Sequence, residues 1–129
     1  MRKWTDPIVS SHALFLVNAL LWWGVGSPEC GVLLVMSCAA SVGHHLLNEQ
    51  SVTMGDIDRA LALWALAGTV CHTAQYMSVG EWVNCAILLG GALLCKMYGD
   101  RSGSYRLWHT LWHIMVFVGQ AYLAYLCAY

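Results

Sequence analysis

The sequence is poor in charge. Only 10% of its 129 residues are Asp, Glu, Lys or Arg, whereas a soluble domain usually carries roughly a quarter. Six Lys and Arg residues are balanced by seven Asp and Glu residues, and no basic tract is present, which argues against a nucleic-acid partner. The six cysteines include no CxxC pair, so we expect buried free thiols and no disulfides.

Apolar residues are abundant instead. They make up 59% of the chain, which is more apolar surface than a core of this size can hide. Seven Trp and six Tyr are typical of proteins whose aromatic rings lie at membrane interfaces. The composition therefore predicts an integral, multi-pass membrane protein embedded in a lipid bilayer.

Five apolar stretches approach the roughly 20 residues that a helix needs to cross a bilayer. We expect spans at about 8–25, 30–47, 57–79, 82–98 and 105–128. Short connections make neighbouring helices antiparallel, and no linker is long enough to separate domains. The prediction is an all-α, polytopic transmembrane helical bundle that forms a single domain over residues 1–129.

Positive charge is confined to one side of this five-span arrangement. The N-terminal segment, the connection between the second and third spans and the connection between the fourth and fifth spans hold all six positive charges: Arg2, Lys3, Arg59, Lys96, Arg101 and Arg106. By the positive-inside rule this side is cytoplasmic. The predicted topology has the N-terminus in the cytoplasm and the C-terminus outside.

Residues suited to metal chemistry fall on the same predicted side. His109 and His113 are four residues apart, so they share one helical face, as two ligands of one ion must. Ser41 and His45 have the same spacing on the second span. A third imidazole from that span completes a three-His site with an open position, which is typical of catalytic zinc. An Asp from the third span could hold or deprotonate the metal-bound water.

The order Ser41-x-x-x-His45, Asp56, His109-x-x-x-His113 resembles the CREST superfamily of membrane proteins. That superfamily includes the alkaline ceramidases, the progestin and adipoQ receptors, and lipid hydrolases that remodel GPI anchors. The resemblance implies that His45, His109 and His113 bind Zn²⁺. It also implies that Ser41 and Asp56 are catalytic residues that engage the zinc-bound water or the substrate. The superfamily usually has seven spans, so this chain resembles a shortened form.

Neighbouring residues compete for two of these positions. His44 competes with His45, and the register with Ser41 together with the motif selects His45. Asp58 competes with Asp56, and the motif selects Asp56. Two further histidines in apolar segments are interpreted as hydrogen-bonded packing residues: His12 and His72.

These patterns favour a zinc-dependent intramembrane hydrolase near the cytoplasmic leaflet. Its substrate is expected to be an amide or ester of a membrane lipid, with a ceramide-like amide as the first candidate, cleaved by zinc-activated water. The alternative is a non-catalytic receptor or scaffold module that zinc staples together. A b-type haem protein with paired imidazoles is a third hypothesis, but it leaves Ser41 and Asp56 unexplained. The helical surface is also compatible with a homo-oligomer.

Overall fold

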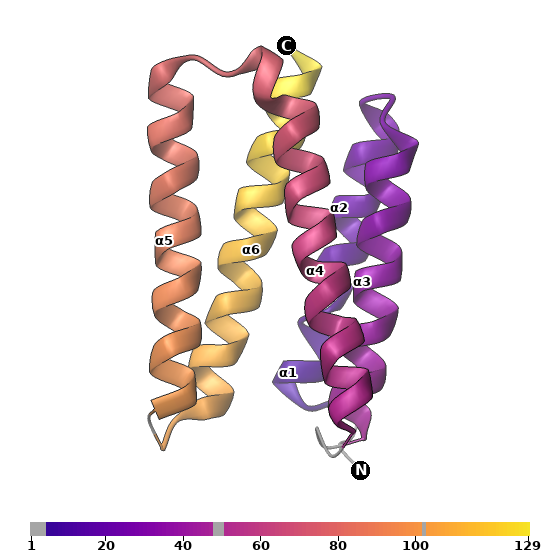
Figure 1. Cartoon of the computed structure of the whole chain (residues 1–129), viewed down its shortest axis with the longest axis vertical. Coiled ribbons are helices and arrows are strands. Elements are labelled where there is room, and N and C mark those ends of the chain that lie inside the picture. The colour runs from indigo at the N-terminus through magenta and orange to yellow at the C-terminus, as the bar shows by residue number, and fades with distance from the viewer. Residues whose placement is uncertain (1–4, 48–50, 102) are drawn as a thin grey trace.

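The computed structural model describes residues 5–47, 51–101 and 103–129, and all regular structure within them is helical. Figure 1 shows long helices running side by side, with successive ones antiparallel. In chain order the elements are α1 (Pro7–Ser10), α2 (Ala13–Gly24), α3 (Pro28–Leu46), α4 (Val52–Thr73), the 3-10 helix η1 (Ala74–Tyr76), α5 (Val79–Arg101) and α6 (Tyr105–Ala128). The predicted all-α helical bundle is confirmed.

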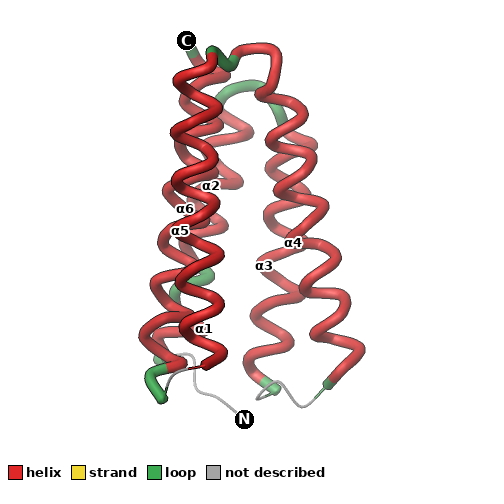
Figure 2. The backbone as a smooth tube through the Cα atoms, turned by 60° about the vertical axis from the view of Figure 1, so that its left-hand side comes forward, coloured by secondary structure: helices red, strands yellow, loops and turns green. Residues whose placement is uncertain are grey.

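The helices pack as an α2–α3–α4 group and an α5–α6 hairpin. α3 lies against both α2 and α4, and α6 carries α5 on one side while it contacts α2 and α4 on the other. Figure 2, turned from the first view, shows α3 and α4 side by side along their length. α5 makes most of its contacts with α6.

Four helical segments in the described part of the chain are long and apolar enough to cross a membrane. They are Pro7–Gly24, Pro28–Leu46, Val79–Gly99 and Tyr105–Ala128, and they correspond to the first, second, fourth and fifth predicted spans. Large apolar side chains are exposed on the outside of the bundle, as lipid-facing residues would be, among them Leu20, Leu63, Trp64 and Ile87. This apolar outer surface is compatible with a membrane protein.

The predicted third span corresponds to α4, which differs from the expectation of residues 57–79. The helix begins at Val52, because the Ser51 side chain caps it by accepting a hydrogen bond from the Met54 backbone N–H at 3.2 Å. It ends at Thr73, where the chain tightens into η1. Its first turns are polar, and it falls outside the group of four apolar segments.

The first predicted span is interrupted at Ser11 and His12, between α1 and α2. Here the backbone tightens, since the His12 N–H donates to the Val9 carbonyl at 3.2 Å and not to the residue four back. The Ile8 carbonyl accepts side-chain hydrogen bonds instead, from Ser11 Oγ at 2.9 Å and from His12 Nδ1 at 2.7 Å. This break turns the His12 ring into the bundle, where it is 1% exposed.

The core is apolar with a few polar links between helices. Its members are Phe15, Ala19, Trp22, Cys30, Leu34, Cys38, Ala65, Leu123 and Ala124. Asn18 Nδ2 donates to the Phe117 carbonyl at 3.1 Å, which joins α2 to α6. Gln120 Nε2 donates to Thr69 Oγ1 at 3.0 Å, which joins α6 to α4. Such bonds within membrane bundles contribute on average about 0.6 kcal/mol each.

All six cysteines are free thiols, as expected. The structure buries fewer of them than the sequence predicts. Cys30 and Cys38 are buried in the core, whereas Cys71 is exposed. The exposed thiol lies on an outer face of α4. Apolar neighbours in the sequence do not place a residue in the core when the outer face of the helix is apolar too.

Candidate metal centre

Four buried histidine rings lie next to one another inside the bundle, at the end that α1 occupies in Figure 1. His12 comes from the break after α1, His45 from the last turn of α3, and His109 and His113 from the start of α6. Ring centroids are 4.2 Å apart for His12 and His113, and 4.8 Å apart for His45 and His109. Each side chain is at most 5% exposed, so the cluster is shielded from its surroundings.

Three of these rings are grouped closely enough to share a metal ion. His12, His45 and His113 each offer a ring nitrogen, and these three nitrogens lie within 4.8 Å of one another. Two nitrogens on one tetrahedral zinc, each at 2.0–2.1 Å, are about 3.4 Å apart. Small side-chain movements therefore suffice for the trio to hold a metal ion.

The hydrogen bonds of His12 fix its tautomer with the lone pair on Nε2, which lies 2.7 Å from the Ser41 hydroxyl and would exchange that contact for a metal ion. Its Nδ1 lies 2.7 Å from the Ile8 carbonyl and 3.2 Å from the Val9 carbonyl. Carbonyl oxygens only accept hydrogen bonds, so Nδ1 carries the proton and Nε2 carries the lone pair. A backbone carbonyl that fixes the second nitrogen in this way is the usual outer support of a metal-binding histidine.

Ser11 fixes His113 in the same tautomer, with the proton on Nδ1. The Ser11 hydroxyl uses its proton on the Ile8 carbonyl at 2.9 Å, so it accepts the hydrogen bond that links it to His113 Nδ1 at 2.6 Å. Nε2 of His113 is consequently unprotonated. It is buried, and no hydrogen-bond partner for it is found in the part of the chain that the structure describes. A buried, unpartnered nitrogen is costly in a protein, and a metal ion would satisfy it.

Replacing Ser11 should weaken metal binding without removing a ligand. We expect Ser11→Ala to lower zinc affinity by about 10–100-fold, as the loss of outer-shell partners typically does. Ser10→Ala is the matched control, because Ser10 is exposed and bonds only the Asp6 carbonyl among the contacts seen here. Competition with a chromophoric chelator measures both affinities, and equal values for the two variants would contradict the role given to Ser11.

The structure brings the three predicted ligands together and adds a fourth imidazole. His109 Nε2 lies 3.1 Å from His45 Nε2, and the centroids of His109 and His113 are 4.7 Å apart. His12, interpreted from the sequence as a packing residue, lies in the closest trio instead. One sequence feature is consistent with the position of His12. The predicted topology places the start of the first span at the same membrane depth as the other histidines of the cluster.

The two candidate acids have different surroundings. Asp56 is 65% exposed and does not line the cavity, although Arg59, with which it pairs one turn later, does. Asp58 lines the same cavity as Ser41 and His45, and its carboxylate interacts with the Ser41 hydroxyl. Ser41 Oγ is also 2.7 Å from His12 Nε2. Of the two acids, Asp58 is therefore the one that can act beside the histidines.

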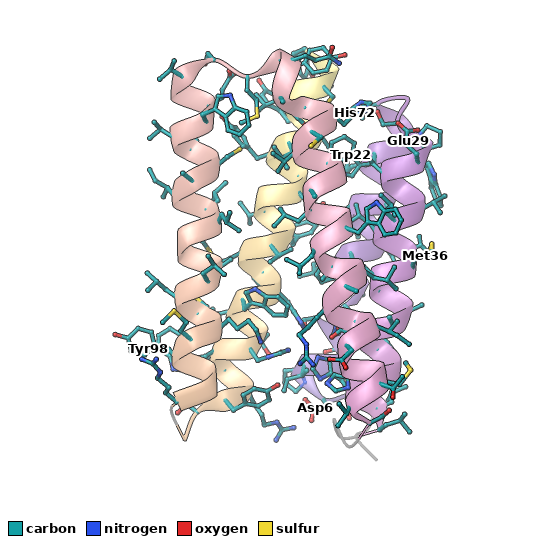
Figure 3. The ribbon with its side chains drawn as sticks, viewed as in Figure 1. Asp6, Trp22, Glu29, Met36, His72 and Tyr98 are labelled. Atoms are coloured by element: carbon teal, nitrogen blue, oxygen red, sulfur yellow. The ribbon has the colours of Figure 1, made fainter. Side chains whose placement is uncertain are left out.

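The remaining two histidines, His44 and His72, do not belong to the cluster of four rings. The His44 ring is 5.3 Å from that of His45 but packs against α4, where a Cβ added to Gly55 would come within 3.0 Å of it. His72 lies at the opposite end of the bundle from Asp6, as Figure 3 shows.

A cavity of about 750 Å³ adjoins the histidine cluster. Its polar wall includes Ser41, Asp58 and His113 together with the basic side chains of Arg59 and Lys96. The rest is predominantly apolar and is contributed largely by α4, α5 and α6, with Leu66, Leu89, Leu93, Val116 and Leu123 among its members. The volume is within the range of small-molecule sites, and the lining suits a hydrocarbon chain.

Comparisons of the chain with protein-family models, curated proteins and solved structures found no match.

Proposed function

We propose that this protein is a zinc-dependent hydrolase that cleaves an amide or ester bond of a lipid within the membrane. The proposal depends above all on the buried, unpartnered Nε2 of His113, because it belongs to a metal-competent trio that faces a largely apolar cavity. The resemblance of Ser41-x-x-x-His45 and His109-x-x-x-His113 to the CREST superfamily supports the same function. The predicted topology places the site near the cytoplasmic leaflet.

His12, His45 and His113 would hold the zinc. When bound, zinc supplies a Lewis acid that lowers the pKa of water and polarises a carbonyl. Their all-imidazole donor set suits zinc. The backbone carbonyl of Ile8 supports His12 directly and His113 through Ser11.

Two side chains beside the trio supply the remaining chemistry. The Asp58 carboxylate accepts a proton from the water that attacks the lipid carbonyl, and it returns that proton to the departing amine or alcohol as the carbon–nitrogen or carbon–oxygen bond breaks. The Ser41 hydroxyl donates a hydrogen bond to the carbonyl oxygen as negative charge develops there. A single donor of this kind contributes about 2.7–4 kcal/mol in comparable sites.

The cavity would receive the hydrocarbon part of the substrate. Its apolar walls can bury an acyl or sphingoid chain, while the scissile bond lies at the polar end among Ser41, Asp58 and the histidines. A ceramide-like amide fits this division between a polar end and a long apolar part.

A non-catalytic role is the alternative, because a metal held by the trio would also join the α1–α2 break, α3 and α6. In that case chelation would lower the thermal stability of the purified protein while no lipid is turned over. Lipid hydrolysis that depends on zinc separates the two functions.

Filling the cavity should impair hydrolysis selectively. Purified protein with zinc is incubated with ceramides and ester lipids, and the released fatty acid is measured. Gly119 lines the cavity, and a Cβ there meets nothing within 4 Å, so we expect Gly119→Phe to retain zinc but to lower turnover of long-chain substrates by about 10-fold or more, equivalent to about 1.4 kcal/mol.

Gly90→Phe is the matched control. A Cβ at Gly90 also meets nothing within 4 Å, but Gly90 is not part of the cavity wall. The proposal fails if the wild-type protein releases no fatty acid from any lipid in the panel. The cavity assignment fails if the two variants are equally active.

A further inference from the structure

A second group of metal-ligating side chains lies at the end of the bundle opposite α1. Glu29 and Cys30 belong to the first turn of α3, and His72 belongs to the last turn of α4. A carboxylate oxygen, the Cys30 sulfur and a His72 ring nitrogen lie within 4.8 Å of one another. Figure 3 shows Glu29 and His72 side by side at this end.

The His72 ring is oriented by neighbours that leave one nitrogen facing the group. Its Nε2 is 2.7 Å from the Ser27 hydroxyl oxygen, and the buried Trp22 ring packs edge-on against it at 5.9 Å. Its Nδ1 is 3.6 Å from Glu29 Oε1. That separation is too long for a hydrogen bond but close to the roughly 3.4 Å between two ligands of one tetrahedral zinc.

Cys30 adds a sulfur ligand from the protein interior. The side chain is 2% exposed and belongs to the apolar core, so the group combines a shielded thiol with a half-exposed imidazole and an exposed carboxylate. Thiolate, imidazole and carboxylate together are ligands typical of zinc and related transition-metal ions. Metal binding would release the thiol proton.

We propose that Glu29, Cys30 and His72 form a second binding site for a divalent transition-metal ion such as Zn²⁺. The site links the start of α3 to the end of α4. It is independent of the histidine cluster at the α1 end, and it does not depend on the hydrolytic function proposed above.

Cobalt is a probe that distinguishes the two sites. The proposed first site has no sulfur ligand, so only the second can produce a thiolate-to-Co²⁺ charge-transfer band. The protein in detergent is titrated with Co²⁺, and we expect a band that Zn²⁺ displaces. Cys30→Ser should abolish the band, while His113→Ala should retain it. Cys71→Ser, which removes the exposed thiol next to His72, is the matched control and should also retain it.

Glu29→Gln provides a second variant at an exposed position, where folding is not at risk. It should weaken the Co²⁺ affinity reported by this band by at least the roughly 10–100-fold that the loss of an outer-shell partner costs. Circular dichroism checks that each variant keeps its helices. The proposal is overturned if the wild-type protein gives no charge-transfer band, or if helical Cys30→Ser protein keeps the band at full strength.

Discussion

His113→Ala should lose zinc and lipid hydrolysis together. The substitution removes the buried ring whose Nε2 has no partner in the described residues, so we expect zinc affinity to fall by more than the roughly 100-fold that outer-shell changes reach. Because Lewis-acid catalysis contributes several kcal/mol, turnover should fall about 10³-fold or more. Metal analysis of the purified protein and fatty-acid release measure the two effects.

A pair of variants identifies the third ligand. We expect His12→Ala to lose zinc as His113→Ala does, since the His12, His45 and His113 nitrogens form the mutually close trio. His109→Ala should retain more zinc than His12→Ala. The reverse result, with zinc kept in His12→Ala and lost in His109→Ala, would contradict the trio and support the ligand set predicted from the motif. Full turnover in zinc-free His113→Ala protein would contradict a metal-dependent reaction altogether.

Asp58→Asn should abolish most of the turnover and leave zinc in place. The amide cannot take a proton from the attacking water, and the loss of a general base typically costs 10²–10⁴-fold. Asp58 lines the cavity beside Ser41 and His45, while zinc is assigned to imidazoles. Fatty-acid release at saturating lipid, together with metal analysis, measures this separation of catalysis from binding.

Asp56→Asn is the control two residues away. Asp56 is 65% exposed and pairs with Arg59, and surface ion pairs contribute about 0–1 kcal/mol, so both turnover and zinc content should stay near those of the wild type. If Asp56→Asn instead loses turnover while Asp58→Asn keeps it, the acid predicted from the motif is the catalytic one.

Composition and periodicity are enough to predict the architecture, because the length, apolar character and spacing of each helix depend only on neighbouring residues in the sequence. Low charge and long apolar stretches predict membrane-length helices, and four of the five predicted spans have counterparts that are long and apolar enough to cross a bilayer. Spacing of four residues places His109 and His113 on one face of α6 whatever the rest of the chain does. Short connections predict the antiparallel order seen in Figure 1.

The composition of the site, in contrast, was decided by tertiary packing. His12 enters the cluster only because the backbone tightens at Ser11 and the Ile8 carbonyl holds the ring. Asp56 and Asp58 are two residues apart, and the rotation of α4 against α3 decides that Asp58 and not Asp56 lines the cavity with Ser41. Periodicity places residues on a face of their own helix. Which face meets which neighbour depends on how side chains interlock across helices, and that information lies in no single stretch of the sequence.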